Sequence, residues 1–147
     1  MAQAFEKIIV TVSPKEFFEV ISDYESYPQF ISALTGVKVL KRGKNRAVVE
    51  FEANLVRPFR YTLELKEKAP SSLSWKLLNG DFIRKNTGRW SLTSKGKKTE
   101  AMYEIDVELS RLVPGFVTSL LVKESLPKTL QEFRMRAEGI KNKRKED

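Results

Sequence analysis

The sequence predicts an α+β fold in which a curved antiparallel sheet of about seven strands wraps around one long C-terminal helix, with two short helices after the first strand. Three observations lead to this prediction. A strand pattern near the N-terminus runs directly into a proline-initiated helix. Apolar and polar residues then alternate from residue 36 to residue 110, and one amphipathic helical pattern follows residue 114.

The first strand and the two short helices occupy residues 3–31. Residues 3–12 carry apolar side chains on one face of a strand, namely Ile8, Val10 and Val12. Ser13 and Pro14 then supply an N-cap and a first helical residue, and Glu16 completes a capping box. A second short helix is expected over residues 23–31, with a break near Tyr27-Pro28.

Residues 36–110 have the two-residue period of half-buried antiparallel strands. Gly, Asn, Ser and Lys separate the segments, which predicts a meander of about six strands. The apolar face of this meander comprises Val49, Phe51, Ala53, Leu55, Phe59, Tyr61, Leu63, Leu65, Leu73, Trp75, Leu77, Trp90, Leu92, Ala101, Tyr103, Ile105 and Val107.

The last helix is expected to start at Pro114-Gly115 and to end near Ile140. Its apolar stripe is formed by Val122, Leu126, Leu130, Phe133, Ala137 and Ile140. Pro127 lies inside it, so a kink is expected there. Residues 1–140 therefore form one predicted domain, and residues 141–147 a basic tail that we expect to be disordered.

The composition excludes several kinds of chemistry. The chain of 147 residues contains neither histidine nor cysteine, which excludes thiolate nucleophiles, histidine bases and the usual zinc sites. We therefore expect no metal, no cofactor and no catalytic residue. The N-terminus has no secretory signal pattern, and no charge-free stretch, including the apolar one between Arg111 and Lys123, is long enough to span a bilayer. A cytoplasmic location, or a peripheral one at a membrane, is expected.

The formal net charge of +8 favours anionic partners. The cations gather in three places: Lys38, Lys41, Arg42, Lys44 and Arg46 around one turn, Lys95, Lys97 and Lys98 around another, and Lys141, Lys143, Arg144 and Lys145 in the tail. Such runs more often belong to solvated turns than to a specific anion-binding surface. RNA or ribosome contact is left open by the charge but has no RNP-like aromatic motif to support it, and DNA is not expected as a partner.

Four segments carry a resemblance to a known family: Ser22-Asp23-Tyr24-Glu25-Ser26-Tyr27-Pro28-Gln29-Phe30, then Gly80-Asp81-Phe82, then Gly88-Arg89-Trp90-Ser91-Leu92, and last Leu126-Pro127 with Phe133 and Arg136-Ala137-Glu138. In this order, over nearly the whole chain, they resemble the START-like (SRPBCC, helix-grip) superfamily and within it the polyketide cyclase/dehydrase and coenzyme Q-binding subfamily. The resemblance implies a deep cavity for a lipid, sterol, quinone or aromatic polyketide. The chain departs from the coenzyme Q-binding members at Asp81, where they carry proline, and in a run over residues 83–87 that looks one residue longer.

Thirteen residues are candidates for binding a hydrophobic ligand: Tyr27, Phe30, Phe51, Phe59, Tyr61, Trp75, Asn86, Trp90, Tyr103, Phe116, Leu120, Leu126 and Leu130. Taken singly, the aromatic members are more often ordinary core residues; taken together, they favour a pocket. The hydroxyls of Tyr61 and Tyr103 need partners when buried, and a ligand oxygen is one candidate. Asn86 is a candidate for orienting a ligand headgroup. A bulge in the long run before Trp90 would turn Arg84 outward.

Binding or transport of a lipid, isoprenoid quinone or polyketide-like molecule, without catalysis, is therefore the expected function. A polyketide aromatase/cyclase is one alternative, but it needs an acid or base in the pocket, and the strand carboxylates are predicted to face outward: Glu50, Glu52, Glu64, Glu104 and Asp106. A ribosome- or RNA-associated regulator is the other. The apolar start of the last helix, with Phe116 and Val117 near the loop of Leu55 and Val56, could act as an entrance that touches an anionic membrane.

Overall fold

The computed structural model describes the backbone of residues 2–146 and the side chains of residues 2–140. The first elements along the chain are β1 (Ala2–Val10), α1 (Pro14–Ile21) and the 3-10 helix η1 (Tyr24–Gln29). Six strands follow: β2 (Leu34–Gly43), β3 (Arg46–Asn54), β4 (Pro58–Lys68), β5 (Ser72–Gly80), β6 (Ile83–Lys95) and β7 (Lys98–Leu109). The chain closes with α2 (Gly115–Leu120), the π-helical turn η2 (Leu121–Ser125) and α3 (Leu126–Glu146).

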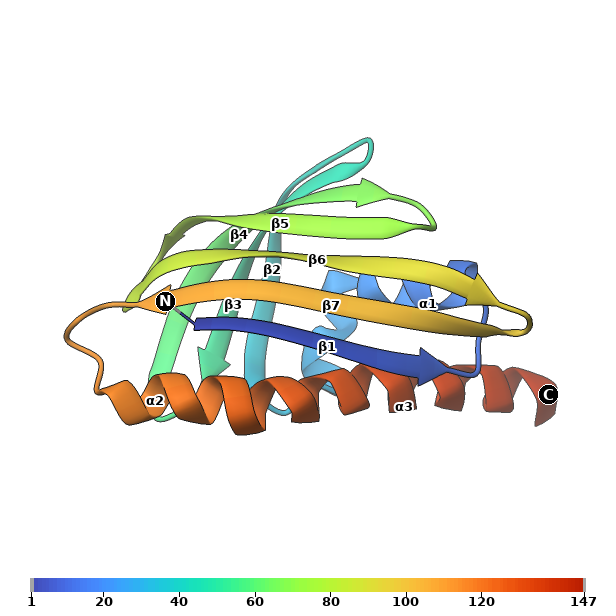
Figure 1. Cartoon of the computed structure of the whole chain (residues 1–147). Helices are drawn as coiled ribbons and strands as arrows, with labels where there is room; N and C mark the ends of the chain where they lie inside the picture. The colour runs from blue at the N-terminus through green and yellow to red at the C-terminus, as the bar shows by residue number, and fades with distance from the viewer. Residues whose placement is uncertain (1, 147) are drawn as a thin grey trace.

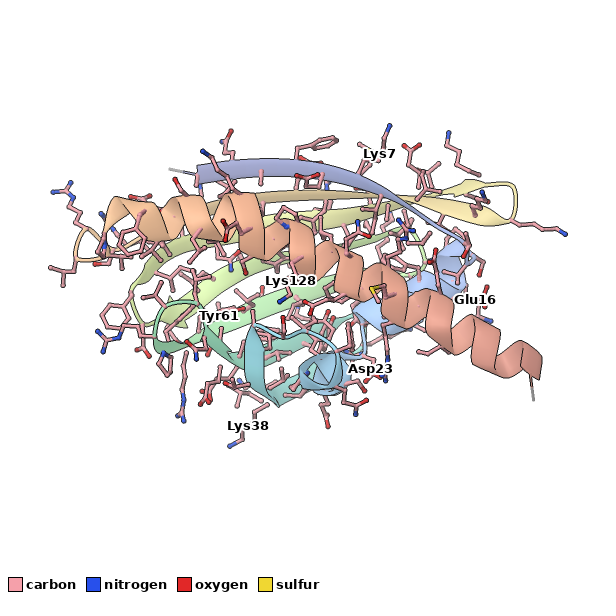
Figure 2. The ribbon with its side chains drawn as sticks, turned by 90° about the horizontal axis from the view of Figure 1, so that it is seen from below. Lys7, Glu16, Asp23, Lys38, Tyr61 and Lys128 are labelled. Carbon is pink, nitrogen blue, oxygen red and sulfur yellow. The ribbon has the colours of Figure 1, made fainter. Side chains whose placement is uncertain are left out.

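The seven strands form one antiparallel sheet in the order β1-β7-β6-β5-β4-β3-β2. Figure 1 shows the C-terminal helix running along the open side of this curved sheet, with α1 and η1 beside the strands at one end. Figure 2, seen from below, shows the helix crossing the sheet, with Tyr61 on the side that faces it and Lys7 and Lys38 pointing outward. The α+β architecture predicted from the sequence is confirmed.

The start of α1 follows from its capping residues. The Ser13 hydroxyl accepts a hydrogen bond from the Glu16 backbone N–H at 3.2 Å, and the Glu16 carboxylate accepts one from the Ser13 N–H at 3.0 Å. This reciprocal pair is the capping box predicted from the sequence. The second short helix is also confirmed, as a 3-10 helix, but the break predicted near Tyr27-Pro28 is wrong, because the helix contains Pro28 and ends at Gln29.

The kink predicted near Pro127 coincides with a π-helical turn. The final helical path changes direction partway along its length in Figure 2, and the π-helical turn η2 lies directly before the segment that contains Pro127. The N–H of Leu126 bonds to the carbonyl of Leu121, five residues back. A wider turn of this kind accommodates a residue that lacks the N–H for the regular ladder, so the proline is absorbed by a change of helical pitch.

The main core lies between the sheet, α1 and α3. Phe17 and Phe133 both pack edge-on against Trp90, with ring centroids 5.4 and 5.5 Å away. A smaller buried cluster of Ile105, Val107 and Leu126 lies nearer the start of the helix. The predicted tail, residues 141–147, stays a prediction, because its side chains and residue 147 lie outside the described residues.

Candidate functional site

A cavity of about 310 Å³ lies between the sheet and the C-terminal helix. Side chains from η1, β3, β4, β5, β6, β7 and the final helix form its wall, and both buried clusters contribute to it. Its volume is at the lower end of the range for small-molecule sites, about 300–1,000 Å³. Ten of the thirteen predicted residues line it: Tyr27, Phe51, Phe59, Tyr61, Trp75, Asn86, Trp90, Tyr103, Phe116 and Leu126.

Three predicted residues lie elsewhere. Phe30 packs against Phe133 outside the cavity wall, with the Arg136 guanidinium 5.2 Å from its ring centroid. Leu130 is buried in the main core, and Leu120 is half-buried outside the cavity wall. An apolar helical pattern does not distinguish residues that line a cavity from residues that pack in the core beside it.

Sequence reasoning placed Leu55 and Val56 at the entrance but missed the other loop residues around the mouth of the cavity. Arg57, Asp81, Phe82 and Leu112 also line it. They come from the β3–β4, β5–β6 and β7–α2 connections, where no strand or helix period exists to assign a facing direction. Phe82 also adopts a left-handed backbone conformation, with φ at 58°, which a bulky side chain rarely takes. The one sequence signal that could have identified Phe82 as a cavity residue was the presence of an aromatic side chain in a short turn.

Trp75 and Asn86 form a polar pair in the cavity wall. The Trp75 indole N–H donates to Oδ1 of Asn86 at 2.9 Å. Gly88 makes this contact possible, because it faces Trp75 across the β5–β6 pair and a Cβ there would collide with the indole ring. Asn86 is 7% exposed, and its Nδ2 makes no hydrogen bond to any described residue.

Tyr61 and Tyr103 present hydroxyls to the cavity. Neither hydroxyl is hydrogen-bonded to a described residue, and burial raises the pKa of both phenols well above the usual value of a tyrosine. Both therefore stay protonated and able to donate a hydrogen bond. Tyr27 differs, since its hydroxyl donates to the carbonyl of Ile21.

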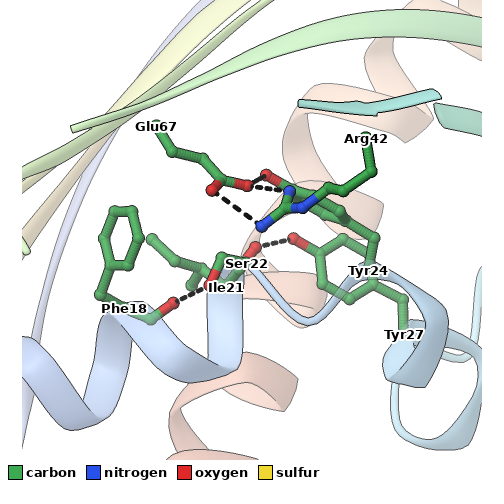
Figure 3. A network of polar contacts seen from close by, with 7 residues as sticks. All are labelled: Phe18, Ile21, Ser22, Tyr24, Tyr27, Arg42 and Glu67. Carbon is green, nitrogen blue, oxygen red and sulfur yellow. Dashed lines mark hydrogen bonds and ion pairs between the residues drawn. The ribbon is translucent and has the colours of Figure 1, made fainter. Parts of the chain in front are cut away.

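Tyr27 is held in place by a polar clamp at the neighbouring turn of η1. The Tyr24 hydroxyl donates to Oε2 of Glu67 at 2.6 Å, and Arg42 binds both oxygens of the same carboxylate (Figure 3). The Arg42 guanidinium also lies 5.8 Å from the Tyr24 ring centroid. Because Tyr24 and Glu67 are buried, the clamp fixes η1 against β2 and β4 and so sets one wall of the cavity.

Charged groups are confined to the mouth of the cavity. Among the described residues that line it, Arg57 and Asp81 carry charges, and both are exposed. The bulge predicted before Trp90 is confirmed between Ile83 and Lys85, and it turns Arg84 outward to Glu108, 3.6 Å away. The strand carboxylates predicted to face outward are absent from the described wall: Glu50, Glu52, Glu64, Glu104 and Asp106.

Exposed apolar side chains surround the mouth. Val56, Phe82, Leu112 and Phe116 come from three connections and the start of α2, and Leu112 is 86% exposed. Arg57 lies among them, with its guanidinium 4.9 Å from the Phe82 ring centroid. Phe116 and Val117, expected from the sequence to lie near Leu55 and Val56 at an entrance, line the same cavity as these two residues.

The outer face of the sheet carries cations near the other end of the strands. Lys41, Arg46, Lys66 and Lys68 are exposed there and make no ion pair with any described residue. Arg46 lies directly opposite Lys66 in the β3–β4 register, and Lys95 opposite Lys98 in the β6–β7 register. Like charges in directly opposed positions destabilise a strand pair. We refer to Lys41, Arg46, Lys66 and Lys68 as the basic face.

The sequence matches a family model over residues 10–134. That model is described as polyketide cyclase / dehydrase and lipid transport. A curated relative, the ribosome association toxin RatA of Escherichia coli K12, is 24% identical over 144 residues, which cover 95% of this chain and 89% of the relative.

Solved structures share the fold. A START superfamily protein from Mycobacterium smegmatis aligns with a TM-score of 0.84 at 22% identity, covering 94% of this chain and 98% of the other. The ZhuI aromatase/cyclase from Streptomyces sp. R1128 aligns with a TM-score of 0.81 at 14% identity, covering 93% of each chain. The fold is therefore shared with an aromatase/cyclase and with a START superfamily protein, and the fold alone does not determine the function.

Proposed function

Because the chain belongs to the polyketide cyclase / dehydrase and lipid transport family, we propose that it binds and carries a hydrophobic ligand in the cavity between the sheet and the C-terminal helix. The main supporting observation is the cavity wall, in which aromatic side chains surround the Tyr61 and Tyr103 hydroxyls and the Nδ2 group of Asn86, none of which is hydrogen-bonded to a described residue. An ordinary core would fill this volume or pair these groups. Ligand transport without catalysis is consistent with this cavity wall, because its charged groups are confined to the mouth.

Recovery of a ligand from the purified protein tests this proposal. Organic extraction followed by mass spectrometry should yield a hydrophobic molecule in near-stoichiometric amount from the wild-type protein. Ala53→Phe is the matched variant, because Ala53 is buried in the cavity wall and a phenyl ring would occupy the ligand's space. The variant should retain its fold, as judged by circular dichroism, and should yield no hydrophobic molecule on organic extraction. A wild-type protein that carries nothing and takes up no hydrophobic probe would reject the proposal.

Catalysis of polyketide cyclisation is less well supported. An aromatase needs a group that moves a proton inside the pocket. The buried phenols of Tyr61 and Tyr103 have raised pKa values and so make poor bases, and Arg84 points away to Glu108. Asp81 lines the mouth, where its carboxylate accepts a hydrogen bond from the Arg60 backbone N–H at 3.2 Å.

Association with ribosomes or RNA is a second candidate function, and the basic face favours it. Unpaired cations of like sign are held side by side on Arg46 and Lys66, an arrangement that an anionic polymer would stabilise. The relative RatA carries ribosome association in its name. The basic face lies about 26 Å along β4 from the mouth, at ~3.3 Å per residue between Pro58 and Lys66, so RNA bound there would leave the cavity accessible.

The salt dependence of RNA binding tests this second function. Arg46→Gln with Lys66→Gln should weaken binding and reduce the slope of log K against log salt by about 1.4, the value for two lost single-strand phosphate contacts. Arg60→Gln with Lys76→Gln removes the same charge from cations already paired with Glu52 and Glu64. If both double variants lost the same RNA affinity, the attraction would depend only on net charge, and the basic face would not be a specific RNA-binding surface.

A further inference from the structure

The outer face of the sheet, on the side away from the cavity, carries an open hollow of about 580 Å³ over β1, β7, β6 and β5. These four strands stand at the front of Figure 1, with no helix drawn over them. Phe5 lines the hollow and is 58% exposed, and Ile9 is exposed on the same face of β1. Met102, half-buried on β7, lies diagonally between them. An exposed apolar patch beside a hollow is typical of a protein–protein contact site.

One row of outward-facing side chains crosses this hollow. The strand register sets its order as Phe5 on β1, Glu104 on β7, Arg89 on β6 and Ser74 on β5. All four residues line the hollow. The row therefore begins with a large apolar side chain and ends with a small one, and it has an anion and a cation side by side at its centre.

The two central charges of the row are available to a partner. The closest N and O atoms of Arg89 and Glu104 are 3.9 Å apart, too far for a hydrogen bond, and both side chains remain exposed. An exposed pair of this kind contributes little to the stability of the fold. Contact with a second charged surface would remove water from both groups and so strengthen their attraction to opposite charges.

The row is complementary to a second copy of itself rotated by half a turn. If a two-fold axis passes between Glu104 and Arg89, each Glu104 meets the Arg89 of the other copy. The same rotation places the Phe5 ring of one copy over Ser74 of the other, where the small side chain leaves room for it. Every contact then occurs twice, as a two-fold axis requires, and two-fold dimers are the commonest protein oligomers.

The neighbouring rows are compatible with the same axis. It brings Lys85 on β6 over Glu100 on β7 of the other copy, which joins opposite charges. It also brings Lys7 on β1 toward Lys76 on β5. That second match falls at the edge of the contact, and Lys76 already has the Glu64 carboxylate 3.6 Å away. Its repulsion is therefore partly neutralised within each chain.

We propose that the protein forms a two-fold symmetric dimer through this outer face, with a second copy of the chain as the occupant of the hollow. The matching rows extend about 14 Å across the strands and about 27 Å along them, from the spacings of ~4.8 Å between strands and ~3.4 Å per residue. A contact of this size belongs to the small and weak class of interfaces, so the dimer dissociates on dilution. Both cavities lie on the other side of their sheets and stay accessible in the dimer.

Sedimentation velocity of the full chain tests the dimer. The wild-type protein should change from monomer to dimer between about 1 μM and about 1 mM, the range expected for a small interface. Phe5→Ser should raise the dissociation constant of the dimer roughly tenfold or more, as the loss of an anchoring aromatic side chain does. Met135→Ser is the matched control, because Met135 is also exposed but lies on α3, away from the hollow. A wild-type chain that stays monomeric throughout this range overturns the proposal.

Reversal of one charge at a time tests the contact between Glu104 and Arg89 of different copies. Glu104→Arg and Arg89→Glu each bring like charges together at both symmetric positions, so each variant alone should stay monomeric. An equimolar mixture of the two variants should dimerise again, because every contact across the axis then joins a cation to an anion. Mixing cannot relieve repulsion within a chain, so recovery on mixing is specific to contact between copies.

The pair of Arg60 on β4 and Glu52 on β3, 3.0 Å apart, provides the matched control. It lies outside the hollow, so Arg60→Glu and Glu52→Arg should each dimerise as the wild-type protein does. If Glu104→Arg or Arg89→Glu alone dimerised like the wild type, or if their mixture stayed monomeric, a second copy would not occupy the hollow in this way. Circular dichroism checks that each variant is folded, and Phe5→Ser still decides the question if a charge reversal prevents folding.

Discussion

At the scale of single residues, the site depends on one missing side chain. Gly88 faces inward between Asn86 and Trp90, at a position where the strand pattern places an apolar side chain. A Cβ there would collide both with the Trp75 ring and with the Glu104 carbonyl. The absence of that side chain allows the indole to lie across the strand and reach Asn86. The alternating pattern predicted which residues face inward, but only the register reveals that Trp75 occupies the space of Gly88.

We predict that Gly88→Ala destabilises the protein by about 1–3 kcal/mol, the usual effect of overpacking a filled site. The indole N–H resonance of Trp75 should shift as its bond to Asn86 is strained. Gly139→Ala is the control, because its Cβ would meet no atom within 4 Å, and it should stabilise the helix by up to about 1 kcal/mol. Urea denaturation measures both; equal stability of Gly88→Ala and wild type would contradict the described packing.

The tyrosines predict how stability depends on pH. The chain has four, Tyr24, Tyr27, Tyr61 and Tyr103, and desolvation by burial is the first cause that raises the pKa of each above its usual 10.0. The folded state keeps these protons above pH 10 while the unfolded state loses them. The free energy of unfolding should therefore be unaffected below pH 10 and fall above it, by about 1.4 kcal/mol per pH unit for each such tyrosine.

Denaturation at increasing pH, with tyrosinate absorbance recorded in parallel, checks this dependence. Absorbance should rise in step with unfolding. The double variant Tyr61→Phe with Tyr103→Phe should show a shallower decline of stability. Free titration of the phenols in the folded protein would show that they are solvated, and the cavity would then be open water.

At the scale of elements, the mouth is built from connections that the sequence pattern left unassigned. The strands and the final helix were predicted from their periods, and six strands lie between residues 34 and 109. Loop side chains have no such period, so the contribution of Arg57, Phe82 and Leu112 to the mouth became visible only in the fold, which brings three loops together. The π-helical turn before Pro127 was also not predictable from the sequence pattern. The proline predicted a local departure from regular α-helix, but not that this departure would be a π-helical turn.

We predict that the mouth contacts a membrane while ligand is exchanged. Its apolar side chains and Arg57 have the composition of an interfacial surface for anionic lipid. Leu112→Ser with Phe116→Ser should reduce flotation with anionic vesicles severalfold. Phe5→Ser with Met135→Ser removes comparably exposed apolar side chains outside the described cavity wall and should leave flotation unchanged. Wild-type protein that fails to float at low salt would rule this contact out.

At the scale of the whole molecule, the two ends of the sheet differ in character. The loops at one end surround an apolar mouth, and the hairpins toward the other carry the basic face. No helix within residues 2–146 has the length and apolarity to cross a bilayer. The net charge was readable from composition, but its separation from the mouth follows from the strand register, which places charges by their position along each strand.

Ten of the thirteen candidate ligand-binding residues line the cavity and three lie outside its wall, which shows what the strand and helix patterns can and cannot predict. Alternation in strands assigns a facing direction, which brought Phe51, Tyr61 and Tyr103 into the wall. It cannot say how far along a strand the core ends and a cavity begins. That boundary depends on the approach of α3 to the sheet, which is set by side chains distant in sequence such as Phe17, Trp90 and Phe133.

The most direct test of the central claim is a crystal structure of the protein as purified, at a resolution sufficient to interpret density between the sheet and the C-terminal helix. The account predicts continuous non-protein density in the cavity, in contact with Trp75 and Tyr103 and within hydrogen-bond reach of Asn86. Helix and sheet packed together with this volume filled by the protein's own side chains would contradict it.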